Sequence, residues 1–232
     1  IIVLSVTAVI GMALAVVVGV WASVRISLGG KTQEDHQSFT WWVVNRLAFL
    51  VGSTNLSVFA VYFLQERFMD MGDTVIEESF GMLMLVVGLA IFISSIPAGW
   101  LSDKFGRKRV CAFSGGLALV GTVIVVTSVN LTMLYVGGII IGVAIGFFYS
   151  ASWALGTTLV PRKEAGRYLG IQNLAGAGAG AVGAYIGGPI GDNIGFTILM
   201  GIFGFLFLIS ALALFGVKEP VKHGKTKEPA VM

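Results

Sequence analysis

One short stretch of the sequence sets glycines, a carboxylate and several bases in a fixed order between two apolar runs. Residues 99–109 read GWLSDKFGRKR. Gly106 lacks a Cβ atom and so permits a sharp chain reversal at positive φ. Asp103 puts a carboxylate at the end of an apolar run, where a base or a helix N-terminus can hold it. We predict an electrostatic gate here rather than a catalytic group, formed by Gly99, Asp103, Gly106, Arg107, Lys108 and Arg109.

Polar side chains inside the apolar runs form a second group of candidates. Such side chains are costly to place in a membrane, so each is a candidate for contact with a solute. Asn55 and Tyr62 share a helical face, and so do Tyr149 and Trp153. The predicted solute-binding residues are Asn55, Tyr62, Ser94, Tyr149, Trp153, Gln172 and Asn173. Other roles stay open, since two of the aromatics could lie at the membrane interface, and Gln172 and Asn173 could bond between helices.

Arg46 is a base five residues inside an apolar run. Its long side chain can reach back to the membrane surface, or it can face a cavity as part of an inner gate.

No Asp or Glu lies in the middle of any apolar run, and no metal-ligand spacing, Ser-His-Asp set or phosphate-binding loop is present. We therefore expect no enzyme, no cofactor, no metal and no nucleic-acid partner.

The composition determines the class of protein that must position these residues. The chain has 232 residues, of which 56% are hydrophobic and 12% are charged, whereas a soluble domain carries about 25% charged residues. Its mean hydropathy is +0.91. Soluble enzymes and disordered tails are thus excluded. The 32 glycines suit membrane helices that cross closely.

Seven apolar runs have the length of a membrane-spanning helix. They cover residues 1–24, 41–64, 80–101, 110–129, 131–155, 168–190 and 194–217. We expect an all-α, multi-pass helical bundle with seven transmembrane helices. Its parts would be a first helix at 1–24, a central cytoplasmic loop at 25–40, a six-helix bundle at 41–217 and a cytoplasmic tail at 218–232.

The connecting loops alternate in charge. The loop after the second run is acidic, with Glu66, Asp70 and Asp73, whereas the loops after the third and fifth runs are basic. Basic loops stay in the cytoplasm. The pattern predicts that the C-terminus is cytoplasmic and that the first run begins outside.

Residues 99–109 resemble the signature loop of the major facilitator superfamily, in which it follows the second helix and often recurs after the eighth. The loop follows the third run here, which the resemblance equates with the eighth family helix. The resemblance implies the C-terminal half of a major facilitator fold, from helix six to helix twelve. It also implies an N-terminal half of the same transporter, outside this chain, as a partner. Residues 161–170 resemble the cytoplasmic loop between the tenth and eleventh family helices.

The resemblance implies secondary active transport by alternating access, in which two bundles rock about a central site. We expect a protein of the plasma (inner) membrane, with the lipid bilayer and a small solute as partners. The run 41–64 offers hydrogen-bond donors but no acids, which favours a neutral polar solute such as a sugar. A drug or metabolite exporter of the same superfamily, and a non-transporting binding or scaffold protein, stay as alternatives.

Overall fold

The computed structural model describes residues 34–159 and 165–217, and within these ranges it contains helices and turns but no strand. The expected span 1–24, residues 25–33, the tail 218–232 and part of the loop after the fifth run lie outside the described residues. The α-helices are α2 (Glu34–Arg67), α3 (Asp73–Phe105), α4 (Arg107–Val126), α5 (Leu131–Leu159), α6 (Ala165–Ile194) and α7 (Phe196–Ala213), with short 3-10 helices η1 (Met69–Met71) and η2 (Leu214–Gly216).

Five of the described helices, α2 to α5 and α7, are long and apolar enough to cross a membrane. The expected multi-pass helical bundle is therefore found, but the expected count of seven membrane-spanning helices is not reached in the described residues. The 30-residue helix α6 has the necessary length. It falls short in hydropathy because its glycines and alanines are less apolar than leucine or isoleucine.

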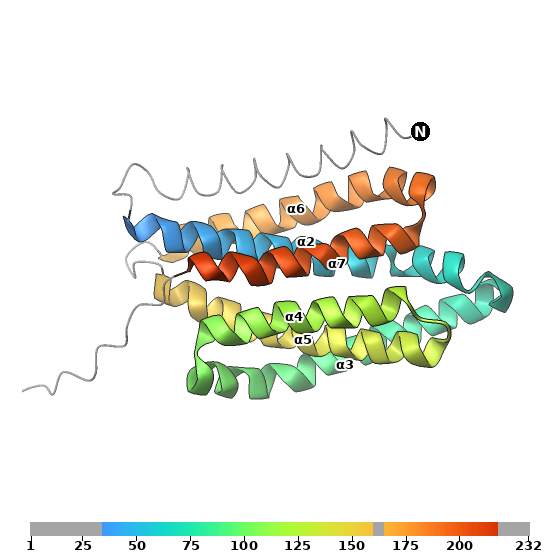
Figure 1. Cartoon of the computed structure of the whole chain (residues 1–232), viewed down its shortest axis with the longest axis horizontal. Coiled ribbons are helices and arrows are strands. Elements are labelled where there is room, and N and C mark those ends of the chain that lie inside the picture. Colours follow the sequence, from blue (N-terminus) through green and yellow to red (C-terminus); the bar gives the residue numbers. More distant parts are fainter. Residues whose placement is uncertain (1–33, 160–164, 218–232) are drawn as a thin grey trace, which may run out of the picture.

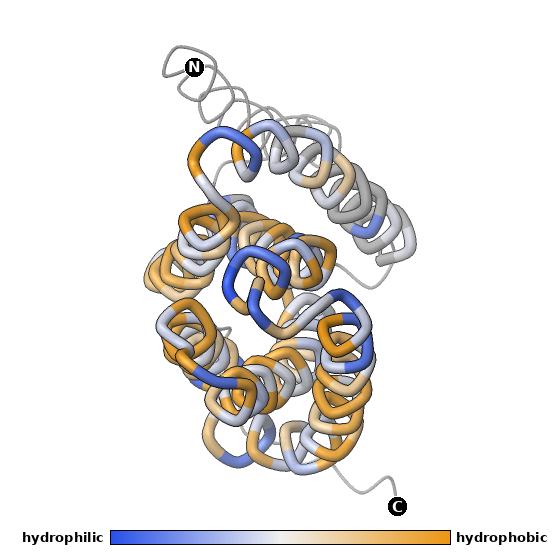
Figure 2. Tube along the Cα trace, turned by 90° about the vertical axis from the view of Figure 1, so that its right-hand side faces the viewer, coloured by the Kyte–Doolittle hydropathy of each residue, from blue (hydrophilic) through white to orange (hydrophobic). Residues whose placement is uncertain are grey.

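The helices run alternately in opposite directions, so that consecutive turns lie at opposite ends of the bundle (Figure 1). α5 packs against α3 and α4, α7 packs against α2 and α4, and α6 packs against α2. Figure 2, viewed from the end where α2 joins α3, has hydrophilic residues gathered in the turns and hydrophobic residues along the helices. This distribution suits a bundle with its helices in lipid and its turns in water.

Several helix boundaries differ from those expected. α2 begins at Glu34 rather than at residue 41, because Phe39 and Trp42 are buried in an apolar cluster with Leu155 and Leu214. The expected run 110–129 is helical only to residue 126, and residue 194 ends α6 instead of beginning α7. Packing accounts for the earlier start of α2, whereas the positive φ of Gly195 separates α6 from α7.

Glycines at positive φ make two of the sharp turns. Gly106 joins α3 to α4 with a φ of 97°, as the sequence predicted, and its N–H donates to the Ser102 carbonyl. Gly195 joins α6 to α7 with a φ of 94°. A residue with a Cβ atom would be strained at either position, so these turns fix where the following helices begin.

Glycines also bring α5 close to α3. A Cβ atom on Gly142 would lie 2.7 Å from the Val87 carbonyl oxygen and 2.8 Å from the Ala90 Cβ atom. One on Gly146 would lie 2.6 Å from the Ile91 carbonyl oxygen. These close approaches are the kind of helix crossing that the glycine content predicted, and they fix the distance between α5 and α3.

A carboxylate joins α2 to α7 at the end of the bundle that contains the α2–α3 turn. The Thr197 hydroxyl donates to Glu66 Oε1 at 2.9 Å, and the Phe196 N–H donates to Glu66 Oε2. The next residue, Arg67, donates from Nε to the Ser128 carbonyl at 2.8 Å in the α4–α5 turn. Because the first N–H groups of a helix lack partners within it, Glu66 caps α7 and meets its positive end.

We expect Glu66→Ala to lower the free energy of unfolding of the purified chain by about 1 to 3 kcal/mol, because donors at the start of α7 lose a charged acceptor. Thermal unfolding in detergent measures the effect. The control is Glu77→Ala, which removes an exposed carboxylate in the first turns of α3. Equal, small losses in both variants would contradict a capping role for Glu66.

Candidate functional site

A pocket lies between α2, α3 and α5, in the part of the bundle nearer the α2–α3 turn. It holds about 490 Å³ of empty space, which includes its open mouth. Ser53 and Ser57 supply the polar side chains of its wall, but each hydroxyl donates to a carbonyl of its own helix. The remaining lining is apolar and consists of Leu56, Ala60, Phe63, Leu64, Leu83, Met84, Val87, Val125, Leu134, Gly138, Ile141, Ile145 and Met200.

Two stacked phenylalanines separate this pocket from the part of the bundle nearer the α3–α4 turn. The rings of Phe49 on α2 and Phe148 on α5 lie 3.7 Å apart and almost parallel. Both side chains are fully buried. The cleft between α2 and α5 is therefore closed at this level.

Beyond the stacked pair, Arg46 extends from α2 to α5. It is 2% exposed, and its Nη1 donates to the Ser152 hydroxyl at 3.3 Å. Its guanidinium carbon lies 4.5 Å from the centre of the Trp153 ring and 5.9 Å from that of Trp42. The Trp42 indole N–H donates to the Ser152 carbonyl. We call Arg46, Trp42, Ser152 and Trp153 the arginine cage.

The arginine cage contains a buried charge with incomplete pairing. Among the described residues no carboxylate lies within ion-pair distance of Arg46, and its Nε has no hydrogen-bond partner. The neighbouring Asn45 donates to the Ser210 hydroxyl and carbonyl on α7, while its own Oδ1 is also unpartnered. Arg46 does not reach the surface of the bundle, so of the two roles open from the sequence the structure has it facing inward.

Three of the predicted site residues lie near one another: Arg46 on α2, and Tyr149 and Trp153 on α5. Tyr149 and Trp153 on α5 lie on the face that meets Arg46, and Tyr149 is 40% exposed. Tyr62 lies apart from them, near the opposite end of α2, where it is 48% exposed and stacks on Phe196 at 5.3 Å. Tyr62 therefore faces α7, whereas Tyr149 and Trp153 lie on the α2–α5 face.

The other predicted solute-binding residues lie elsewhere. Asn55 is fully buried, donates to the Val51 carbonyl and packs against Gly183 of α6. Ser94 is buried between α3 and α5 and donates to the Ile91 carbonyl. Asn173 is exposed on α6, whereas the side chain of Gln172 lies outside the described residues. In this conformation Asn55 and Ser94 pack between helices.

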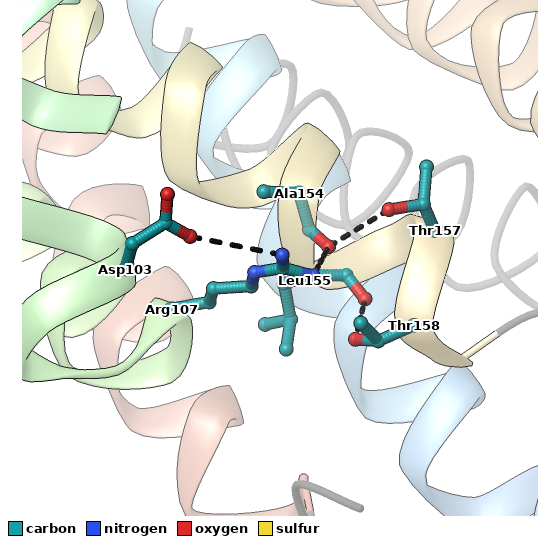
Figure 3. A network of polar contacts seen from close by, with 6 residues as sticks. All are labelled: Asp103, Arg107, Ala154, Leu155, Thr157 and Thr158. Carbon is teal, nitrogen blue, oxygen red and sulfur yellow. Dashed lines mark hydrogen bonds and ion pairs between the residues drawn. The ribbon is translucent and has the colours of Figure 1, made fainter. Parts of the chain in front are cut away.

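The predicted gate forms a network between the α3–α4 turn and α5 (Figure 3). Arg107 Nη1 donates to the Ala154 carbonyl at 2.7 Å, and its Nη2 lies 3.8 Å from Asp103 Oδ1. The Thr157 hydroxyl donates to the same carbonyl. A cation near the C-terminal end of a helix is favourable, so Arg107 ties the turn to α5 while Asp103 is largely exposed.

The remaining residues of the predicted gate have different surroundings. Lys108 Nζ donates to the Val217 carbonyl at 2.6 Å, which ties the start of α4 to the end of η2. Arg109 is exposed. A Cβ atom on Gly99 would meet no atom within 4 Å. The face of α3 around Gly99 is therefore open in this chain.

Sequence reasoning did not identify Glu66, Ser152 or Ser210 as partners. All three bond to residues more than 100 positions away in the chain, such as Ser152 to Arg46. No spacing rule along one helix predicts such contacts. The only signal for Glu66 is its place at the end of an apolar run, just before an acidic turn.

Comparison with known proteins supports the family suggested by the signature loop. Residues 41–231 match the family model described as Major Facilitator Superfamily. The chain is 30% identical over 196 residues to the minor myo-inositol transporter IolF of Bacillus subtilis. It is 29% identical over 163 residues to the probable polyol transporter 3 of Arabidopsis thaliana. It is 33% identical over 141 residues to the multi-drug resistance efflux pump PmrA of Streptococcus pneumoniae.

These matches cover much of this chain but less than half of each relative. The match covers 79% of the chain and 42% of the inositol transporter. The corresponding shares are 67% and 31% for the polyol transporter and 57% and 35% for the efflux pump. The described bundle therefore corresponds to one part of such a protein.

Proposed function

The chain belongs to the major facilitator superfamily, and from this membership we propose that it forms the C-terminal bundle of a secondary active transporter. A second bundle, encoded outside this sequence, would complete the solute path. In such proteins two bundles rock about a site near the membrane midplane and open it to each side in turn. The chain alone would then supply one wall of the path.

The α2–α5 face supports this proposal. Tyr149 and Trp153 of α5 lie along it, and a pocket opens between the same two helices. Tyrosine and tryptophan each have an apolar ring and a polar N–H or O–H group. Such side chains suit the wall of a solute path, because the ring packs against the bundle while the polar group contacts the solute or water. The observation that carries the proposal is that Trp153 of α5 lies over the guanidinium of Arg46 of α2 on this face.

For the solute we propose a small polar organic molecule with several hydroxyl groups, such as a sugar or polyol. The names of the inositol and polyol transporters favour this class. A lipophilic drug is the second candidate, because the pocket is lined almost entirely by apolar side chains and one relative is named as a multi-drug efflux pump.

Transport assays on the complete transporter test the proposal. Proteoliposomes should take up labelled myo-inositol with saturable kinetics and should not expel a cationic dye. Dye efflux without polyol uptake would favour the second candidate. Flux of neither solute, with correctly inserted protein, would contradict both of these candidate solutes.

The third proposal is that the complete protein lies in the plasma membrane with the α3–α4 turn and the C-terminus in the cytoplasm, because Arg107, Lys108 and Arg109 lie at that turn. With the buried Cys111 replaced by serine, Asp73→Cys should react with an impermeant thiol reagent added to intact cells. Lys104→Cys should react only after permeabilisation. The opposite labelling would reverse the orientation.

Asp103 is expected to bias the transport cycle rather than to bind solute, because it lies at the C-terminal end of α3 and is largely exposed. A charge near a helix end contributes about 0.3 to 1 kcal/mol, and about 1.4 kcal/mol shifts a two-state equilibrium tenfold. Asp103→Asn in the complete transporter should therefore shift the inward–outward balance severalfold and leave solute affinity within one conformation unchanged.

Cysteine accessibility on the cytoplasmic side and solute binding measure these two quantities for Asp103→Asn. The conservative variant Asp103→Glu, which keeps the charge beside Arg107, should resemble the parent protein. Unchanged accessibility together with a large loss of affinity would place Asp103 in the solute site.

A further inference from the structure

Arg46 is the least compensated charge in the described part of the chain. It is 2% exposed, and within residues 34–159 and 165–217 no carboxylate pairs with it. A charge in an apolar bundle is unfavourable unless a counter-charge or several hydrogen bonds offset its desolvation. The Ser152 hydroxyl and two indole rings are neutral. The cage therefore favours the arrival of an anion.

The guanidinium presents a particular edge to such an anion. The bond from Nη1 to Ser152 is the one hydrogen bond of the Arg46 side chain among the described residues, and the buried Nε has no partner. Nε and Nη2 lie side by side, and a carboxylate accepts from such a pair in a bidentate arrangement. The unused edge thus matches a carboxylate better than it matches a hydroxyl group.

Arg46 is almost fully buried, and the exposed side chains nearest the cage belong to α5. The stacked rings of Phe49 and Phe148 close it toward the apolar pocket, and Trp42 is fully buried against Gly156. Tyr149 is 40% exposed, and Trp153, over the guanidinium, is partly exposed. A group reaching Arg46 must therefore pass these two aromatic side chains of α5, which lie on the proposed solute wall.

We propose that Arg46 binds a carboxylate of the transported solute, so that the preferred solute within the proposed hydroxylated class carries a carboxylate, as a sugar acid does. This inference rests on the proposed transport function and refines its solute class. The same chemistry could come from a carboxylate in the rest of the transporter, and the experiments below separate these two sources.

Binding to the purified 232-residue chain is the first experiment. Trp42 and Trp153 flank the guanidinium, so a bound anion should change their fluorescence. The matched probes are glucuronate and glucose, which differ by a carboxylate in place of a hydroxymethyl group, at constant ionic strength. Glucuronate should bind saturably and glucose about tenfold to a hundredfold more weakly, the range of a charge-assisted hydrogen bond.

Three substitutions assign the binding to Arg46. Arg46→Gln should abolish the preference for glucuronate, and Arg46→Lys should retain it with weaker binding, because an ammonium group lacks the two-donor edge. The control is Arg67→Gln, which removes an exposed arginine at the other end of α2. Equal responses to both probes, no response to either, or a preference that persists in Arg46→Gln would each overturn the anion site.

Uptake by the complete transporter identifies the source of the carboxylate. Saturable uptake of labelled glucuronate, lost in Arg46→Gln, supports the solute as the source. If the chain binds glucuronate but the complete transporter carries only neutral polyols, the rest of the transporter supplies the carboxylate. The inference then fails while the proposed function stands. Flux of neither class contradicts the proposed function itself.

Discussion

Gly142→Leu should prevent the normal packing of α5 on α3 and lower the stability of the chain by about 3 kcal/mol or more. A Cβ atom at this position would lie 2.7 Å from the Val87 carbonyl oxygen, and backbone atoms cannot yield as a flexible side chain does. Inserting bulk into a packed interior costs about 1 to 3 kcal/mol and occasionally more. Thermal unfolding of the purified chain in detergent is the measurement.

Gly88→Leu is the matched control for this prediction. Gly88 lies on α3, where a Cβ atom would meet no atom within 4 Å, and it is exposed in this chain. A leucine there adds the same volume without a clash, so the unfolding temperature should stay near that of the parent. Leucine favours a helix over glycine, so similar destabilisation of both variants would contradict the close approach at Gly142 as the cause of the loss.

Arg46→Met should stabilise the chain that lacks solute, although it should abolish transport by the complete protein. Replacing buried charges by apolar side chains of similar size stabilises proteins by about 1 to 4 kcal/mol. Methionine is unbranched and can fill the space between the indoles of Trp42 and Trp153. A higher unfolding temperature together with lost uptake would identify Arg46 as a residue retained for function.

The control is Arg67→Met on the same helix. Arg67 is exposed and donates to the Ser128 carbonyl, so its removal relieves no buried charge and should give no gain in stability. If Arg46→Met unfolds at a lower temperature than the parent, then the Ser152 bond and the indole contacts offset the burial of the guanidinium. The argument for a missing counter-charge would then fail.

The features that depend on local chain pattern could be predicted from the sequence. Apolar runs of membrane length predicted the helices, and the glycine at 106 predicted a turn at positive φ. The order of glycine, acid and bases in residues 99–109 predicted the family. Each of these signals lies within one element or one turn, so it can be recognised without knowledge of the packing.

Contacts between distant elements could not be predicted in the same way. Asn55 is polar and lies within an apolar run, which made it a candidate for solute contact, yet its amide packs against Gly183 of α6. The sequence allowed Arg46 either to reach the membrane surface or to face inward, and its contacts with Ser152 and Trp153 of α5 show that it faces inward. Hydropathy reports how polar a residue is, but which neighbouring helix it faces depends on how the helices pack.

The central claim is that solute moves along the α2–α5 face. Its most direct test is protection of Tyr149→Cys in the reconstituted complete transporter, with Cys111 replaced by serine. Solute should slow modification of this cysteine by an impermeant thiol reagent severalfold, at concentrations that saturate transport. Asp73→Cys, at an exposed position at the start of α3, should react at the same rate with and without solute. Saturable transport without protection at Tyr149→Cys would contradict the account.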